Sequence, residues 1–270
     1  MAPSTEAASR PFRSAAPHYL AGRPPYPDRL MRRVARLAGL TAADRVLDLG
    51  CGPAMLAAAF AGFAREVIAM DPEPEMLRAG QAAFGQIANL HLVRGSSDDL
   101  SPELGVFRLV AMGRSFAWMD RPQTLRALDA LIVPGGAIAL FDSGHQDELP
   151  DNAWTVRYRA LRHRHDPPDA ANPRRNSDNW LCHEAILLDS AFSMLESAAV
   201  IERRRTGAAA LVHRALSMSS STPDRLGAAA AARLAGEIEA LVQAVAPDGA
   251  LAEVVTTTAL IARRPGEADV

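Results

Sequence analysis

Short apolar runs alternate with amphipathic stretches through the first half of the chain. The runs with the length of buried strands lie at 45–49, 66–70, 90–94, 106–112 and 137–141. The stretches with apolar residues at helical spacing lie at about 27–37, 54–63, 73–84 and 122–131. Because strands that alternate with helices are typical of βαβ units, the pattern predicts a parallel sheet covered by helices.

The pattern changes after Asp142. Residues 144–180 are polar, with several prolines and clustered charge, and they look like an insertion or lid. The later elements that the pattern predicts are a helix at 183–190, a strand at 196–205, helices over 208–245 with a break at 219–223, and a closing strand at 251–262. The second half therefore mixes helices and strands without the regular alternation of the first.

The strand at 45–49 runs into a glycine turn. Asp48 lies near the end of this strand, and Gly50, Cys51 and Gly52 follow it. Glycine in such a turn lets the backbone approach a ligand closely. The strand at 66–70 is followed by Asp71, at a position where an acid can hydrogen-bond a ribose. Together these features predict a nucleoside cofactor on a doubly wound α/β sheet.

The glycine turn lacks the residues that other nucleotides require. A dinucleotide fingerprint has a third glycine, which permits close helix–strand packing, and Met55 occupies that position here. The chain also has no Gly-x-x-x-x-Gly-Lys sequence that would bind a triphosphate. Both observations count against an NAD reductase and a triphosphate-binding protein.

The turn Asp48-Leu49-Gly50-Cys51-Gly52-Pro53 resembles the first motif of the class I S-adenosylmethionine-dependent methyltransferases. Four later stretches resemble further motifs of that family in the same order, and they are 71–77, 93–100, 107–120 and 131–140. The segment 19–27 is similar to one that opens many small-molecule members and folds over the cofactor. A βα turn of an unrelated α/β protein could explain the first motif alone, but not the series.

The resemblance implies a Rossmann-like fold with a doubly wound, seven-stranded, mostly parallel sheet. We expect four parts along the chain: a disordered N-terminal tail at 1–16, a cofactor-binding core at 17–143, the lid at 144–182, and a C-terminal part of the same domain at 183–270 with a helical cap and closing strands.

The resemblance also implies which residues contact S-adenosylmethionine, and its product S-adenosylhomocysteine. They are Tyr19, Arg23, Asp48, Gly50, Cys51, Gly52, Asp71, Pro72, Met76, Ser96, Ser97, Asp98, Gly113 and Arg114. Asp71 would bind the ribose hydroxyls, with a helix N-cap as its alternative role. Asp98 would accept from the adenine amine, although Asp98 or Asp99 could equally be a plain turn acid. Arg23 or Arg114 would bind the cofactor carboxylate, or lie on the surface.

A general base is needed only if the acceptor must lose a proton. Many relatives carry His or Gln just before Trp118, where this chain has Ala117, and they open the fourth strand with an acid where it has Arg108. His145, just beyond the fifth strand, is the best-placed candidate by spacing. Its alternative is a loop histidine without a role.

Composition narrows the partners. The net charge of −2 gives no strong overall attraction to nucleic acid or anionic membranes, although the basic run at 157–165 could bind a carboxylate, a phosphate or RNA. His163 and His165 lack an evident third ligand, so we expect no metal site. No apolar run approaches the length of a membrane span, and we expect a cytoplasmic protein.

The leading hypothesis is a methyltransferase that acts on O, N or C of a small molecule, in secondary metabolism by analogy with the branch that the N-terminal segment resembles. One alternative is an RNA methyltransferase that uses the basic run. Another is a protein that binds S-adenosylmethionine without methyl transfer. We expect a monomer or a homodimer, and the sequence does not indicate the acceptor.

Overall fold

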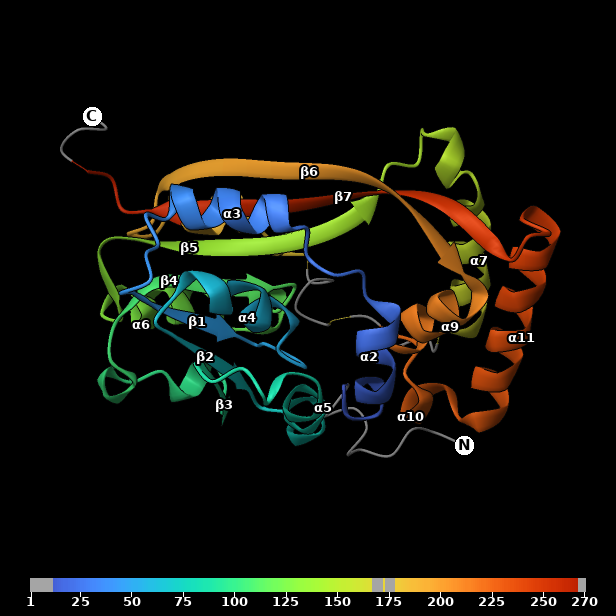
Figure 1. Cartoon of the computed structure of the whole chain (residues 1–270), viewed down its shortest axis with the longest axis horizontal. Coiled ribbons are helices and arrows are strands. Elements are labelled where there is room, and N and C mark those ends of the chain that lie inside the picture. The colour runs from blue at the N-terminus through green and yellow to red at the C-terminus, as the bar shows by residue number, and fades with distance from the viewer. Residues whose placement is uncertain (1–11, 167–171, 173–177, 267–270) are drawn as a thin grey trace. The chain divides into compact units, whose positions relative to one another are not determined.

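The computed structural model of the chain describes residues 12–166, 172 and 178–266 (Figure 1). The chain divides into two compact units. The helical unit comprises Met1–Pro25, Ser143–Asn172 and Ile201–Thr256, and the sheet unit comprises Tyr26–Asp142, Pro173–Val200 and Thr257–Val270. Three long strands, β5, β6 and β7, pass from one unit into the other along the chain.

The strands form one seven-stranded sheet in the order β3-β2-β1-β4-β5-β7-β6. Their bounds are β1 Arg45–Leu49, β2 Glu66–Asp71, β3 Leu90–Arg94, β4 Phe107–Gly113, β5 Ile132–His145, β6 Met194–Gly207 and β7 Ala250–Arg263. Strand β1 pairs in parallel with β2 and β4, β2 with β3, and β4 with β5. These observations confirm the expected doubly wound, seven-stranded sheet, with the order reversing between β1 and β4.

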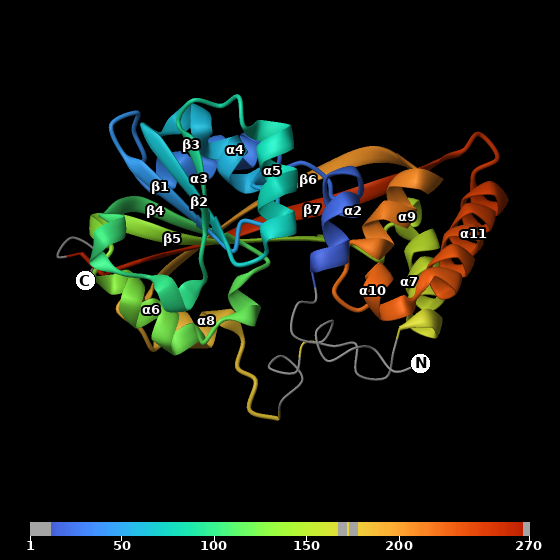
Figure 2. The same cartoon turned by 90° about the horizontal axis from the view of Figure 1, so that it is seen from below.

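Helices cover both faces of the sheet in the sheet unit (Figure 2). The helices are α3 Asp28–Leu37, α4 Met55–Phe60, α5 Pro74–Phe84, α6 Arg121–Asp129 and α8 His183–Leu188, with short 3-10 helices η2 Ala61–Phe63, η3 Ser97–Asp99, η4 Pro102–Leu104 and η5 Phe116–Trp118. One apolar core joins α3 and α4 to one face, through residues such as Leu30 and Phe60. A second core joins α6 and α8 to the other face, through Leu128 and Leu187. Burial from both sides explains why β1 and β2 are nearly continuous apolar runs.

The described part of the helical unit is built mainly from helices. They are η1 Arg13–Ala15, α2 Ala16–Gly22, η6 Pro150–Asn152, α7 Trp154–His165, α9 Ala208–Leu216, α10 Pro223–Leu226 and α11 Ala228–Val245. Trp154 and Tyr158 of α7 share an apolar core with Leu211 of α9 and Ile238 of α11. Helices α2 and α9 touch so closely that a Cβ on Gly22 would lie 2.3 Å from the backbone nitrogen of Arg214.

The structure changes the expected bounds of three segments: the N-terminal tail, the fifth strand and the lid. Of the expected tail at 1–16, residues 1–11 lie outside the described residues, but Arg13–Ala15 already form η1. The fifth strand was expected over 137–141 and instead runs over Ile132–His145, with a shift in its pairing to β4 between Phe107 and Leu109. The polar stretch expected as a lid contains α7, while its residues 167–171 and 173–177 are not among those described.

Within the described ranges, no helix combines the length and the apolar character needed to cross a membrane.

Candidate functional site

The turn after β1 is held against the end of β2 by backbone hydrogen bonds. The backbone N–H groups of Gly50 and Cys51 donate to the carbonyl oxygen of Met70 at 2.8 and 3.0 Å. Gly50 and Gly52 have φ angles of 71° and 55°, in the left-handed region that favours glycine. The two glycines expected from the sequence therefore shape the turn where the strand order reverses, the usual place for a ligand in such sheets.

Asp71 links this turn to the next helix. Its Oδ2 accepts the N–H of Gly52 at 2.8 Å, and its Oδ1 accepts the N–H of Glu73, also at 2.8 Å. The N-cap of α5 is Glu73, so Asp71 is not the helix N-cap that was its alternative role. Burial raises the pKa of Asp71 in spite of these two hydrogen bonds. Each carboxylate oxygen keeps a second lone pair, which a ribose hydroxyl could use.

Asp48 is fully buried beneath the turn. Its Oδ2 accepts the N–H of Ala57 at 2.9 Å, whereas its Oδ1 has no hydrogen-bond partner among the described residues. Burial, and to a lesser degree the charge of Asp71, raise the pKa of Asp48 to about 8. A buried carboxyl oxygen without a partner is costly, and a ligand amine, which would favour the ionised form, or a bridging water would satisfy it. Asp48 therefore fits a cofactor that carries a cationic group.

Ala54 is a feature of the turn that the sequence did not reveal. It has a φ of 61° and is fully buried, although the left-handed region is costly for a residue with a Cβ. Its N–H donates to the carbonyl of Cys51, and α4 begins at the next residue. The strained backbone sits in the loop that carries Gly50 and Gly52, so the strain lies within the candidate site.

Two neighbouring acids at the exit of β3, Asp98 and Asp99, have different surroundings. Ser96 and Asp99 form a reciprocal capping box around η3, in which the N–H and Oγ of Ser96 donate to Oδ2 of Asp99 at 2.8 and 2.9 Å. These hydrogen bonds lower the pKa of Asp99. Asp98 is exposed, and its carboxylate has no partner within the described ranges. Asp99 thus stabilises the turn, while Asp98, next to Ser97, is available to a ligand.

The exit of β4 packs on the glycine turn. Ser115 donates through Oγ to the carbonyl of Leu49 at 2.6 Å, and a Cβ on Gly50 would lie 2.4 Å from that of Ser115. Arg114 has a φ of 60°, and its N–H donates to Phe141 of β5. Arg114 was expected to contact the cofactor, whereas Ser115, a small polar residue of the same loop, was not singled out.

Gly113 and Tyr26 meet on the same side of the sheet unit. A Cβ on Gly113 would lie 2.4 Å from the Tyr26 hydroxyl, and the Tyr26 ring packs edge-on against Phe141 with centroids 5.6 Å apart. Tyr26 belongs to the N-terminal segment whose motif indicated a cofactor contact, but it was not singled out. Its position shows that the end of that segment reaches the β4 exit.

The remaining residues expected at the cofactor differ in exposure. Cys51 and Met76 are buried, and Pro72 is exposed. Burial raises the pKa of the Cys51 thiol well above its ordinary value, so this cysteine is an inert part of the turn. The other cysteine, Cys182, is exposed.

Three expected site residues belong to the helical unit. Arg23 donates to the carbonyl of Ser217 at 3.0 Å, and its guanidinium lies 5.2 Å from the centroid of the Tyr19 ring. His145 Nε2 lies 3.0 Å from Oε2 of Glu253, a residue that no sequence pattern indicated. Their roles toward a cofactor or acceptor stay predictions.

Arg108, the departure from the family pattern in β4, has a structural role. It donates to the carbonyl of Pro134 at 3.2 Å and lies 3.5 Å from Asp44. Because it is the second residue of β4, it lies at the strand end opposite to the glycine turn. The presence of Arg108 where many relatives have an acid is therefore no argument against methyl transfer at the candidate site.

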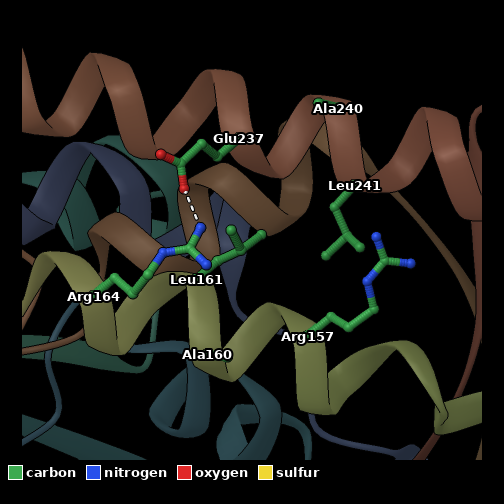
Figure 3. Close-up of a pocket in the computed structure, with 7 residues that line it drawn as sticks. All are labelled: Arg157, Ala160, Leu161, Arg164, Glu237, Ala240 and Leu241. Atoms are coloured by element: carbon green, nitrogen blue, oxygen red, sulfur yellow. Dashed lines mark hydrogen bonds and ion pairs between the residues drawn. The ribbon is translucent and has the colours of Figure 1, made fainter.

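The basic run at 157–165 lies on α7, beside α11 (Figure 3). Two of its four arginines form ion pairs, Arg159 with Asp147 and Arg164 with Glu237, and the histidines His163 and His165 lie beside Asp166 and Glu237. A groove of about 400 Å³ between the helices is lined by Arg157, Ala160, Leu161, Arg164, Glu237, Ala240 and Leu241. The acids compensate part of the positive charge, which weakens the attraction of this helix for a phosphate backbone.

No group of three or more metal-ligating side chains is found in the part of the chain that the structure describes.

Comparison with known proteins identifies relatives for much of the chain. A family profile described as "Methyltransferase domain" matches residues 46–136. A malonyl-[acyl-carrier protein] O-methyltransferase of Enterobacter lignolyticus is 30% identical over 198 residues, which cover 70% of this chain and 68% of that protein. An uncharacterized methyltransferase of Mycobacterium tuberculosis is 30% identical over 138 residues, so the match spans about half of both chains.

Solved structures share the fold. A provisionally assigned type II methyltransferase from Anaeromyxobacter dehalogenans superposes with a TM-score of 0.64 at 22% identity, covering 90% of this chain and 97% of that one. A protein from Geobacter sulfurreducens, solved with S-adenosyl-L-homocysteine, gives a TM-score of 0.52 at 15% identity, covering 95% and 98%. At these identities the likeness concerns the fold.

Proposed function

Because the chain belongs to the class I S-adenosylmethionine-dependent methyltransferases, we propose that it binds S-adenosylmethionine at the glycine turn and methylates a small-molecule acceptor. The observation that carries this proposal is the pair of acids around the turn. Asp71 holds Gly52 and keeps lone pairs for a ribose, and Asp48 presents an unpaired buried oxygen.

S-Adenosylmethionine supplies an electrophilic methyl group on a sulfonium, and S-adenosylhomocysteine is the product. The residues around the turn bind and orient the nucleoside and the amino acid part. Asp71 would accept the ribose hydroxyls, Asp98 the adenine amine, and Asp48 the ammonium, directly or through a water. Catalysis then rests mainly on positioning and on exclusion of water, as is usual for an in-line displacement.

The roles of Tyr19, Arg23, Arg114 and His145 are proposed from the sequence motifs. We assign Arg23, with Tyr19 beside it, to the cofactor carboxylate, and Arg114 is the other candidate for that contact. His145 would take a proton from an acceptor that must lose one before or during transfer. These roles follow from the N-terminal motif and from the place of His145 at the end of β5.

The acceptor class follows from the relatives by analogy. The relative from Enterobacter lignolyticus is named for O-methylation of a malonyl group on an acyl-carrier protein, and this supports a modest-sized acceptor for the present chain. O-, N- and C-methylation all remain compatible with the residues described. A role in secondary metabolism, a cytoplasmic location and a monomeric or dimeric state belong to the same proposal.

Calorimetric titration tests the cofactor. The purified chain is titrated with S-adenosylmethionine, S-adenosylhomocysteine and NAD, next to Asp71→Ala and the control Asp189→Ala, which removes an exposed acid of the sheet unit. We expect micromolar binding of the first two compounds, weakened about tenfold or more in Asp71→Ala through loss of charged hydrogen bonds. Preference for NAD, or no binding of either compound by the parent chain, would contradict the proposal.

A screen with S-adenosylmethionine labelled in the methyl group then tests transfer. It compares phenols, aliphatic alcohols, amines and carboxylic acids under the same conditions. Labelled product from one class would establish the reaction. Cofactor binding with no product from any class would favour a protein that binds S-adenosylmethionine without methyl transfer.

A further inference from the structure

The sheet unit contains a buried arginine to which the proposed function gives no role. Arg121 is the first residue of α6 and is 8% exposed. Among the described residues no carboxylate pairs with its guanidinium, and burial lowers the pKa of this group. An arginine is still charged at neutral pH, and a buried charge without a counter-charge is costly. An anionic ligand would remove this cost.

Three neighbours hold the guanidinium in one orientation. Its Cζ atom lies over the ring of Trp180, 3.7 Å from the ring centroid. Nη1 donates to the carbonyl of Leu181 at 2.7 Å and to Nδ1 of His183 at 3.2 Å. An arginine only donates hydrogen bonds, so Nδ1 of His183 accepts and the imidazole is neutral in this arrangement. The cluster of Arg121, Trp180 and His183 therefore carries a single positive charge.

The edge of the guanidinium opposite Nη1 has donors to offer. Within the described ranges, Nε and Nη2 of Arg121 have no hydrogen-bond partner. The N–H groups on these two atoms are parallel, and they form the fork that binds both oxygens of a carboxylate. A dianionic phosphate would keep one charge uncompensated, since the cluster supplies only one. The arrangement therefore favours a carboxylate over a phosphate.

The loop at the exit of β4 contacts both this cluster and the glycine turn. A Cβ on Gly50 would lie 2.4 Å from the Cβ of Ser115 and 3.3 Å from Cε of Met119. Phe116, which lies between these two residues in the chain, packs against His183 with ring centroids 5.2 Å apart. The cluster and the turn therefore adjoin the same short loop, and both belong to the sheet unit.

We propose that Arg121, held in place by Trp180 and His183, binds a carboxylate of the methyl acceptor through its Nε and Nη2 groups. This rests on the proposed function, because it assigns the carboxylate to the acceptor. It narrows the acceptor to an organic acid. Leu181, which is 50% exposed next to Trp180, offers apolar surface to the rest of such a molecule. The bound carboxylate would orient the acceptor and compensate the buried charge.

NMR of the indole N–H groups in the full chain tests the binding. The chain has three tryptophans, and Trp180→Phe identifies the resonance of Trp180. The parent chain is titrated with phenylacetate, phenylacetamide and phenyl phosphate, which share a ring and differ in charge. We expect a saturable shift of the Trp180 resonance with millimolar phenylacetate, binding of the amide at least about tenfold weaker, and binding of the phosphate severalfold weaker. No shift with phenylacetate, equal binding of the amide, or tighter binding of the phosphate would overturn the proposal.

Substitutions assign the binding to Arg121. Arg121→Met removes the charge and keeps an unbranched apolar side chain, and the affinity for phenylacetate should fall at least about tenfold. Arg126→Met, at an exposed position of the same helix, is the matched control and should leave the affinity unchanged. Arg121→Lys keeps the charge without the fork, so we expect a severalfold loss, and this variant decides the question if Arg121→Met does not fold. Unchanged affinity in a folded Arg121 variant would contradict the proposal.

Two measurements distinguish this proposal from the proposed function. Calorimetry should give the same S-adenosylmethionine affinity for the parent chain and Arg121→Met, because no cofactor contact is assigned to Arg121. A parent chain that does not bind the cofactor would overturn the proposed function, whereas the phenylacetate titration decides the role of Arg121 separately. In the transfer screen, organic acids should be methylated in preference to their amides, with a KM that rises about tenfold in Arg121→Met. Equal methylation of acid and amide would contradict the acceptor role of Arg121 while the proposed function stands.

Discussion

The carboxylate of Asp71 accepts the backbone N–H of Gly52 at 2.8 Å, so that an acid at the end of β2 holds the glycine turn at the end of β1. Its other oxygen accepts the N–H of Glu73 at the start of the next helix. One side chain therefore fixes two backbone segments and presents its remaining lone pairs to a ligand. We therefore expect Asp71 to contribute both to the stability of the fold and to ligand affinity, and the two contributions can be measured independently.

Asp71→Ala leaves the N–H groups of Gly52 and Glu73 without their acceptor. We expect the free energy of unfolding to fall by about 1–3 kcal/mol, the usual cost of leaving buried donors unsatisfied. Urea unfolding measures this, with Asp189→Ala expected within about 0.5 kcal/mol of the parent chain. A loss of stability without any loss of S-adenosylmethionine affinity would contradict the ribose role.

Asp48 should make stability depend on pH. Burial raises its pKa from an ordinary value of 3.8 to about 8, so the folded state binds a proton that the unfolded chain releases. The free energy of unfolding should therefore be highest below pH 4 for this group and should fall as pH rises to about 8, by at most about 1.4 kcal/mol per pH unit. Urea unfolding at pH 5 and pH 8 should show a smaller difference in Asp48→Asn.

Asp44→Asn is a control, because the pKa of Asp44 is lowered in the folded chain whereas that of Asp48 is raised. Burial alone would raise the pKa of Asp44, but hydrogen bonds from Thr41 and the neighbouring Arg108 lower it. Its contribution to stability is therefore complete above its unfolded pKa and is lost only at lower pH. The difference between pH 5 and pH 8 should be the same as in the parent chain. Equal pH dependence in the parent chain and Asp48→Asn would refute the assignment to Asp48.

Ala54→Gly should stabilise the chain. The left-handed backbone at φ 61° costs a residue with a Cβ about 1 kcal/mol, and glycine removes that cost while adding flexibility to the unfolded chain. We expect a net gain of about 0.5 kcal/mol in the free energy of unfolding. Ala59→Gly, in the regular helix α4, should instead lose about 1 kcal/mol. A loss in both variants would argue against strain at Ala54.

Asp98 and Asp99 should respond in opposite ways. Asp99→Ala removes the capping box with Ser96 and should cost about 1 kcal/mol of stability. Asp98→Ala removes an exposed carboxylate without described partners, so stability should stay within about 0.5 kcal/mol. S-Adenosylmethionine affinity, measured by calorimetry, should fall severalfold in Asp98→Ala. Unchanged affinity there would leave Asp98 as a plain turn acid.

RNA binding should be weak. Arg159, Arg164 and His165 of the basic run face acids, and the chain carries a net charge of −2. We expect a dissociation constant above about 10⁻⁴ M for a fluorescent RNA hairpin at physiological salt, at or beyond the weak end of non-specific binding. Anisotropy titrations over a range of salt concentrations measure it. Micromolar, strongly salt-dependent binding that Arg157→Ala reduces would revive the RNA methyltransferase hypothesis.

Local patterns predicted the sheet unit well. The strands at 45–49 and 90–94 have the same bounds in the structure, because both are short runs closed by residues that end a strand. The fifth strand was expected too short, since Pro134-Gly135-Gly136 indicates a turn. In the structure these residues form an irregularity inside β5, where the pairing to β4 shifts.

The sequence did not indicate which residues far apart in the chain are in contact. All 29 basic residues other than histidine are arginines, and nothing local marks Arg214 as the one that binds Glu253, 39 positions away. Ser115 and Tyr26 lie within the motifs but were not singled out, because their contacts depend on how β4 and the N-terminal segment come together. Glycines and acids at strand ends, by contrast, carry a local signal.

The two cysteines of the chain should differ in their reactivity toward alkylating reagents. Cys51 is buried within the turn with a thiol that resists ionisation, whereas Cys182 is exposed. A maleimide or iodoacetamide probe should thus attach to the folded chain once, at Cys182, without mutagenesis. Slower alkylation at Cys51 would require the glycine turn to open, so its rate would report how often the proposed cofactor site unfolds and how far a bound nucleoside suppresses that opening.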